Sequence, residues 1–409
     1  MTTVVRCGTL IDGRGNDPLT DVSVLIEGST IVGVGRNLHI PPDTHQVDAS
    51  AVTVMPGMID CHVHLVVTPR SIADQLGLPF SYTVAEGLQN ARITLEAGFT
   101  SVRDASLTPL GVKMAIDRGL FPGPRMRIAV SAIGQTGGHG DSTMPSGVDV
   151  RQETSERPNG VIDGADAARR AARLVLRAGA DQIKIITSGG VMSPSDEPGS
   201  TGLTPDEIAA VVYEAHAAGK KVMSHAQATQ GIKNAVNAGV ESIEHGFYLD
   251  DEVIEAMILR GTYLVPTLIA PVWLIRRSES TPGSLPEYAQ RKARQVVSAS
   301  QASFRRAVER GVKIAMGTDM GCGPHGSNAE ELVLMVQNGM SPMQAIVAAT
   351  STAAECLGIG DITGTIEPGK RADLIGVRTN PLADIAGLSP PSVLLVMKDG
   401  IVFKDQLSN

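Results

Sequence analysis

The chain has 409 residues, of which 42% are hydrophobic and 19% charged, an ordinary globular composition that excludes a disordered, collagen-like or coiled-coil protein. The 35 basic and 43 acidic residues give a net charge of −8, and aromatic residues make up only 3%. This balance offers no general attraction for nucleic acid or anionic membranes and no platform for stacking bases, so we expect a small-molecule partner, with neither nucleic acid nor membrane.

The first 55 residues are expected to form short strands. Residues 22–27 and 30–35 flank Gly28-Ser29, which is a hairpin signal. The N-terminus has no apolar segment typical of a signal peptide, and no run of 18 apolar residues follows. We therefore expect a cytoplasmic protein.

Between residues 56 and 360, short apolar runs alternate with amphipathic helical patterns. The eight strand candidates are residues 57–65, 100–104, 127–134, 182–188, 221–226, 242–245, 263–268 and 313–319. The helical patterns cover residues 84–97, 110–118, 165–177, 205–217, 231–238, 251–260, 289–309, 328–337 and 342–356. Eight β/α units predict an α/β fold, a (β/α)₈ TIM barrel over residues 56–360. An open doubly wound sheet is the alternative, disfavoured by the count of eight and the scarcity of Gly-x-Gly-x-x-Gly motifs.

The last residues resemble the first. Residues 371–377 and 392–398 are strand-like, and Asp399-Gly400 is a second hairpin signal. Because both chain ends are rich in strands, we expect residues 1–55 and 361–409 to meet as one small β-sandwich domain beside the barrel.

Histidines mark the ends of several barrel strands. Asp60, His62 and His64 alternate along the first strand, so their side chains share one face. His225 and His245 end two later strands, and Asp319 ends the last. Active sites of such barrels form at these strand ends, and imidazoles and carboxylates bind divalent metals there. A shared metal site is the simplest interpretation; unrelated core histidines are the alternative for the first pair alone.

Lys184 lies within a strand that should be apolar on both faces. A buried ammonium without a partner tends to lose its proton. A neutral amine can react with carbon dioxide to give a carbamate, which can bridge two metal ions. The alternative is a lysine that extends to the end of its strand.

These residues resemble the amidohydrolase superfamily. The resemblance rests on Pro-Gly-Met-Ile-Asp-Cys-His-Val-His at 56–64, Lys184, the two later histidines, Gly-Thr-Asp at 317–319 and Gly-Thr-Ile-Glu-Pro-Gly-Lys-Arg-Ala-Asp-Leu at 364–374. Segments 135–140 and 188–191 are most similar to the binuclear zinc carboxypeptidases and prolidase-like dipeptidases, and to ochratoxin-hydrolysing amidases.

The resemblance implies two divalent ions, with zinc expected, although manganese, cobalt or iron accept the same donors. It assigns His62, His64 and Asp319 to one ion, His225 and His245 to the other, and N6-carboxylysine at Lys184 to both. A hydroxide that bridges the metals would attack the carbonyl. Asp319 would be catalytic, taking the proton of the water and passing it to the leaving amine.

Three further residues are candidates for substrate contact. His139, in a glycine-rich loop, is expected to bind the substrate and to take part in catalysis; an exposed loop histidine is the alternative. Gln227 stands where relatives of the carboxypeptidase type carry a tyrosine, and His325 follows Asp319 closely. No arginine stands out beside the strand ends as an obvious carboxylate clamp, although Arg103, near the end of the second strand, could approach the rim.

The expected function is hydrolysis of amide or peptide bonds, releasing a C-terminal amino acid from dipeptides or N-acyl amino acids. Hydrolysis of neutral amides, carbamates or ureas is the alternative. A deaminase is disfavoured by Lys184, and a non-catalytic scaffold by the complete set of ligands. A homo-oligomer is expected, although no interface can be identified from one chain.

Overall fold

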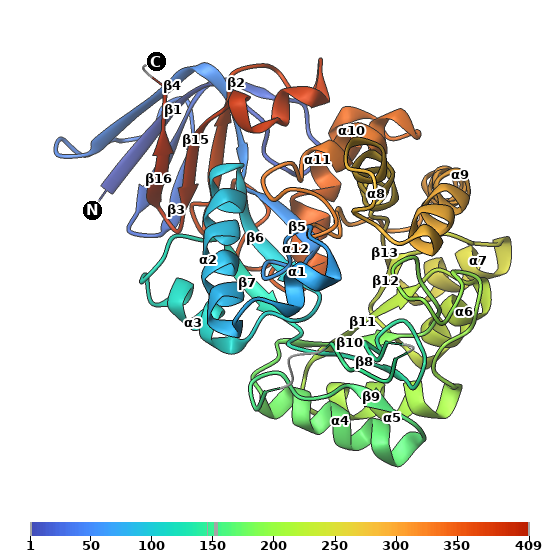
Figure 1. Cartoon of the computed structure of the whole chain (residues 1–409). Coiled ribbons are helices and arrows are strands. Elements are labelled where there is room, and N and C mark those ends of the chain that lie inside the picture. Colours follow the sequence, from blue (N-terminus) through green and yellow to red (C-terminus); the bar gives the residue numbers. More distant parts are fainter. Residues whose placement is uncertain (1, 145, 151–153, 408–409) are drawn as a thin grey trace.

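The computed structural model describes residues 2–144, 146–150 and 154–407. Both chain ends contribute to one sheet, as the sequence predicts (Figure 1). Its order is β16-β15-β14-β4-β1-β2-β3, and the predicted turns at Gly28-Ser29 and Asp399-Gly400 join antiparallel neighbours. The strands are β1 (Thr2–Leu10), β2 (Leu19–Glu27), β3 (Thr30–Gly35), β4 (His45–Pro56), β14 (Leu374–Val377), β15 (Val393–Lys398) and β16 (Ile401–Asp405).

The rest of the chain places parallel strands at the centre of the molecule. One sheet has the order β5-β6-β7 and the other β13-β12-β11-β10-β8-β9. The strands are β5 (Met58–Val63), β6 (Phe99–Asp104), β7 (Arg125–Ile128), β8 (Ala132–Gln135), β9 (Val161–Ile162), β10 (Gln182–Ile186), β11 (Lys221–Ala226), β12 (Ser242–His245) and β13 (Tyr263–Val265). Strands β5, β6 and β10 are buried at every residue, as expected for parallel strands covered on both faces.

Two of the predicted strands differ in the structure. Residues 127–134 contain two strands, β7 and β8, because the chain turns between them, where Val130 has a φ of 62°. Residues 313–319 form no regular strand. They still lie between β13 and β5, joined by the parallel bridges Leu264–Ile314 and Val63–Met320. A Cβ on Gly317 would lie 2.4 Å from Val265, so glycine allows this close approach.

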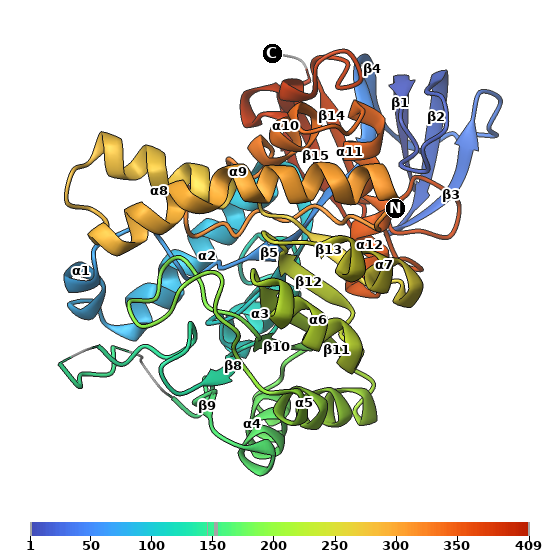
Figure 2. The same ribbon diagram turned by 90° about the vertical axis from the view of Figure 1, so that its right-hand side faces the viewer.

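Helices surround the parallel strands, and α4 to α7 lie outside β10 to β13 (Figure 2). They are α1 (Ile72–Leu76), α2 (Phe80–Glu96), α3 (Leu110–Asp117), α4 (Ala165–Arg177), α5 (Pro205–Ala217), α6 (Thr229–Ala238), α7 (Asp251–Arg260), α8 (Ile269–Ser280), α9 (Glu287–Arg310), α10 (Glu330–Gln337), α11 (Pro342–Ala348) and α12 (Ser351–Leu357). The predicted helix 342–356 is divided by the non-helical Thr350. Helix α8 was not predicted; its Pro271 is tolerated because it lies in the first turn.

The terminal sheet and the parallel strands are directly connected. Strand β4 ends at Pro56 and β5 begins at Met58. A Cβ on the intervening Gly57 would lie 2.2 Å from Thr100 Oγ1. Arg125 of β7 also binds Asp373 and Asp399 of the terminal sheet, both at 2.6 Å. The path of β5, which carries His62 and leads directly into His64, is therefore fixed from both parts. Among the described residues, no helix combines the length and apolarity that crossing a membrane requires.

Candidate metal centre and active site

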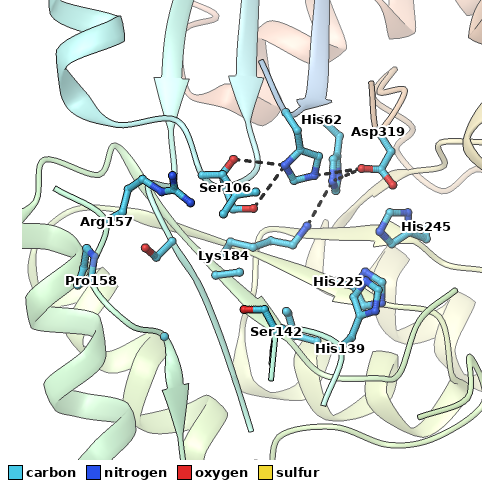
Figure 3. Close-up of a pocket in the computed structure, with 17 residues that line it drawn as sticks. His62, Ser106, His139, Ser142, Arg157, Pro158, Lys184, His225, His245 and Asp319 are labelled. Atoms are coloured by element: carbon cyan, nitrogen blue, oxygen red, sulfur yellow. Dashed lines mark hydrogen bonds and ion pairs between the residues drawn. The ribbon is translucent and has the colours of Figure 1, made fainter. Parts of the chain in front are cut away.

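The six predicted metal ligands lie together at one end of the parallel strands (Figure 3). Asp319 Oδ1 lies 3.3 Å from His62 Nε2 and 3.1 Å from His64 Nε2. Lys184 Nζ lies 3.4 Å from His62 Nε2, and the rings of His225 and His245 are 4.6 Å apart. One ligand atom each from His62, His245 and Asp319 fall within 4.8 Å of one another. The side chains that the sequence places at the strand ends thus lie together in one cluster.

The outer ring nitrogens of these histidines are occupied. His62 Nδ1 donates to Glu244 Oε2 at 2.6 Å, and His245 Nδ1 contacts Thr267 Oγ1 at 2.7 Å. An acceptor at Nδ1 favours a proton on that nitrogen. The other ring nitrogen, Nε2, can then face the cluster unprotonated and bind a metal through its lone pair. The arrangement is the one that metal-binding histidines require.

Two of the candidate ligands have an unusual backbone. His245 has a φ of 75° and Asp319 a φ of 60°, in the left-handed region that non-glycine residues rarely adopt. Such conformations cost about 1–3 kcal/mol each and persist where the surrounding structure enforces them, often at functional sites. Here the conformation turns both side chains back over the strand ends.

Burial and neighbouring charges control protonation at the site. Burial lowers the pKa of Lys184 to about 8, although the carboxylates of Glu244 and Asp319 oppose the shift. Burial also lowers the pKa of His225 and His245 well below the usual value. Burial raises the pKa of Asp319, but the charge and hydrogen bond of His62 outweigh it, and the net pKa is well below the usual value. Neutral imidazoles, a reactive amine and a carboxylate are suited to divalent cations.

His64 differs from the other two histidines. Burial lowers its pKa, yet the hydrogen bond and charge of Asp319 raise it overall. The proton that this pair shares occupies the position where a cation would bind both residues. A metal ion would therefore displace this proton.

The predicted substrate residues are placed differently from one another. His139 stacks on His225 with ring centroids 4.3 Å apart, its Nδ1 is 2.9 Å from Ser193 Oγ, and it lines the metal-facing cavity. Gln227 is buried in a small adjoining cavity, and its Oε1 has no hydrogen-bond partner among the described residues. His325 is not brought to the cluster: its Nε2 donates to Val67 O at 2.9 Å, and it lines a separate cavity beside Trp273.

Arg103 and Asp60, from the first two parallel strands, contact internal partners. Arg103 does not act as a carboxylate clamp at the rim: it is 3% exposed, binds Glu244 Oε1 at 2.8 Å and donates from Nε to Cys61 O at 2.7 Å. Asp60 lies beneath the cluster, accepting from Thr318 Oγ1 at 2.7 Å and Asn328 at 2.8 Å. Both side chains form their hydrogen bonds with internal groups, so neither is positioned to contact a substrate.

Glu244 and Arg157 are the residues that sequence reasoning missed. Glu244 is fully buried and holds both His62 and Arg103. Burial raises its pKa, but Arg103 and His62 lower it to about 2, so it is a carboxylate. The sequence shows that Glu244 precedes His245, but it does not show that its side chain contacts His62 and Arg103 on other strands. Arg157 comes from an irregular loop and lines the cavity of about 260 Å³ in front of the cluster.

Parallel strands ending in a histidine, lysine and aspartate cluster define the class of a metal-dependent hydrolase of amide C–N bonds. Residues 53–402 match the amidohydrolase family model. The chain belongs to the amidohydrolase family.

Similar proteins cover nearly the whole chain. Ochratoxinase of Aspergillus niger is 33% identical over 426 residues, which span 98% of this chain and 86% of that protein. A crystal structure of a Xaa-Pro dipeptidase with methionine in its active site is 37% identical, with a TM-score of 0.90 over 99% of this chain and 100% of that one. A prolidase complexed with N-methylphosphonate-L-proline is 33% identical, with a TM-score of 0.93 over 99% and 100% of the two chains.

Proposed function

We propose that this amidohydrolase cleaves the amide or peptide bond before a C-terminal amino acid, in dipeptides or N-acyl amino acids. The observation that carries the proposal is the convergence of four histidines, Lys184 and Asp319 on one cavity. The similarity to a dipeptidase that binds methionine and to a prolidase that binds a proline phosphonate supports an amino acid as the leaving group.

The proposal includes the finer features of the fold. The order β5, β6, β7 and β8, β10, β11, β12, β13, followed by segment 313–320 and β5 again, supports a closed barrel over residues 56–360. Residues 1–55 and 361–409 would be its composite β-sandwich domain. The seven-stranded sheet that both ends build supports this division.

The metal assignment is also part of the proposal. His62, His64 and Asp319 would hold one ion, His225 and His245 a second, and N6-carboxylysine at Lys184 both, with zinc the expected metal. The lowered pKa of Lys184 supports carbamylation, which needs a neutral amine. The 3.4 Å between Lys184 Nζ and His62 Nε2 supports a shared role.

When bound, the two ions would acidify a water molecule and polarise the scissile carbonyl. Asp319, held deprotonated between His62 and His64, would accept the proton of that water and deliver it to the leaving nitrogen. His139, fixed by Ser193 and by its stacking on His225, would donate to the substrate carbonyl. Gln227, whose Oε1 lacks a partner among the described residues, would contact substrate beside His245.

A second candidate function is hydrolysis of neutral amides, carbamates or ureas. It is favoured by the small cavity on the Gln227 side of the cluster, which has the apolar walls Phe247, Leu274 and Val191. The neutral side-chain amide of Gln227, beside these apolar walls, does not require a charged substrate.

The test is a hydrolysis screen of the purified enzyme reconstituted with zinc, manganese or cobalt. Dipeptides, N-acyl amino acids, aryl amides and ureas are compared by kcat/KM. Faster cleavage of the substrates with a free carboxylate supports the first function. Faster cleavage of aryl amides or ureas replaces it with the second, and no cleavage of any of the four classes contradicts both.

A further inference from the structure

Arg157 closes the metal-facing cavity on the side away from the histidines (Figure 3). It belongs to the loop between β8 and β9, and its side chain is 8% exposed. The hydroxyl residues Ser106, Ser131 and Ser142 also line this cavity. Arg157 is therefore a buried cation at a wall that the catalytic groups do not use.

Within the described part of the chain, the guanidinium has no partner that accounts for its charge. No carboxylate of the described residues lies within ion-pair distance of it, and its Nε is buried without a hydrogen-bond partner there. Asp104 acts on it only through space, since Asp104 Oδ2 accepts from Leu65 N at 2.8 Å and Thr108 Oγ1 at 2.7 Å. Leaving a buried charge unpaired is costly, so an anion that enters the cavity would relieve this cost.

The position of the guanidinium is fixed before any ligand binds. Its central carbon lies 5.1 Å from the centre of the Phe80 ring, a cation–π contact. The following Pro158 restricts the backbone of Arg157 to extended conformations. A guanidinium held in this way keeps its donors available in a plane, as binding of a carboxylate through two hydrogen bonds requires.

We propose that Arg157 binds the free carboxylate of the leaving amino acid, so that the substrate spans the cavity from the metal-binding cluster to this residue. This inference rests on the proposed amide hydrolysis and makes a carboxylate next to the scissile amide a requirement. The cavity, at about 260 Å³, is smaller than the roughly 300–1,000 Å³ of sites for drug-sized ligands, and suits a group the size of an amino acid.

The experiment pairs two variants with two substrates. The best N-acyl amino acid from the screen is compared with its carboxamide by release of the acyl group, in wild type, Arg157→Gln and the control Arg276→Gln. Arg276 lies over Trp273 at the same 5.1 Å, but it lines a separate cavity and pairs with Glu330. Binding of the free amino acid to each metal-loaded protein is measured by calorimetry, which needs no turnover.

Arg157→Gln should lose roughly 10²- to 10³-fold in kcat/KM for the acid, the scale for truncating one partner of a buried charge pair. Its loss on the carboxamide should be much smaller, and the activity that remains also shows that the variant is folded. Binding of the free amino acid should weaken by a similar factor, and Arg276→Gln should resemble wild type in every measurement.

Three other results would overturn the inference. If Arg157→Gln retains the preference for the acid, another residue binds the carboxylate, while the proposed function stands. If wild type cleaves acid and carboxamide equally, amide hydrolysis stands and carboxylate recognition fails. If wild type cleaves neither, the proposed function fails, and calorimetry alone decides on Arg157: equal amino-acid binding by wild type and variant contradicts its role.

Discussion

Glu244 gives the sharpest test of how the site is held together. Its two oxygens bind His62 Nδ1 at 2.6 Å and Arg103 at 2.8 Å, and all three side chains are buried. In Glu244→Gln the shape is retained, but one oxygen is replaced by an amide NH₂, which cannot accept a hydrogen bond. The glutamine can serve His62 or Arg103, but not both.

Each alternative has its own cost. If the NH₂ faces His62, Nδ1 must act as acceptor and the proton moves to Nε2, the atom that would bind metal. Loss of such an orienting partner costs about 10- to 100-fold in metal affinity or activity. In either orientation the buried Arg103 loses a carboxylate charge, and if the NH₂ faces Arg103 it loses the hydrogen-bond acceptor as well; breaking such a buried pair destabilises a protein by about 3–5 kcal/mol. We expect both effects, since neither orientation satisfies both partners.

The measurement combines metal titration against a chelator with urea unfolding of the metal-free protein. Arg103→Met combined with Glu244→Gln should regain part of the stability, because the orphaned charge is gone, and part of the metal affinity, because the amide oxygen is then free to accept from His62 Nδ1. Glu241→Gln is the matched control three residues earlier on the chain, where the carboxylate pairs with a half-exposed His216. It should change stability by less than about 1 kcal/mol. Wild-type metal affinity in Glu244→Gln would refute the reasoning about the His62 tautomer.

Three further predictions follow from the same structure. Lys184→Ala should lower the metal content measured by elemental analysis and abolish most activity, with partial rescue by short carboxylic acids; two bound metals and normal turnover would disprove the bridging role. Asp319→Asn should reduce kcat by roughly 10²-fold or more with little change in KM, and near-normal kcat would remove Asp319 from proton transfer. Burial raises the pKa of Glu331 to about 8, so the folded state keeps a proton that the unfolded chain loses near pH 4.3, and stability should fall as pH rises from about 4.3 to 8. Glu331→Gln should flatten this fall by up to about 4 kcal/mol between pH 5 and 8, and parallel unfolding curves for the two proteins would contradict the shift.

The metal ligands could be predicted because they obey strand geometry. His62 lies on β5, His64 follows directly after its last residue, and His245 ends β12, so the period of the chain and the common edge of parallel strands bring them together. Lys184 could be predicted because it is the charged residue within an otherwise largely apolar strand. These inferences need only the local chain direction and the rule that active sites form at strand ends.

The remaining site residues depend on distances that no local pattern encodes. Arg157 comes from the long segment between β8 and β9, and its contact with Phe80 joins residues 77 positions apart in the chain. Arg103 was placed correctly at the end of β6, but its partner Glu244 is 141 residues away in the chain. His325 is close to Asp319 in sequence, yet the glycines around it lead the chain into a neighbouring cavity. Proximity in the sequence therefore does not show which of these residues line the metal-facing cavity.

Strand β4 lies inside the terminal sheet, with β1 on one side and β14 on the other. A chain that stops before Leu374 would therefore leave β4 without its β14 partner along residues 53–56, a short edge prone to pairing with other molecules. Since β4 continues through a single glycine into the strand of His62 and His64, such a shortened protein would misplace the metal ligands as well as aggregate. A newly made chain thus acquires its active site only after its last strands have emerged, and a product cut short near its end would be inactive despite carrying every metal-binding and catalytic residue.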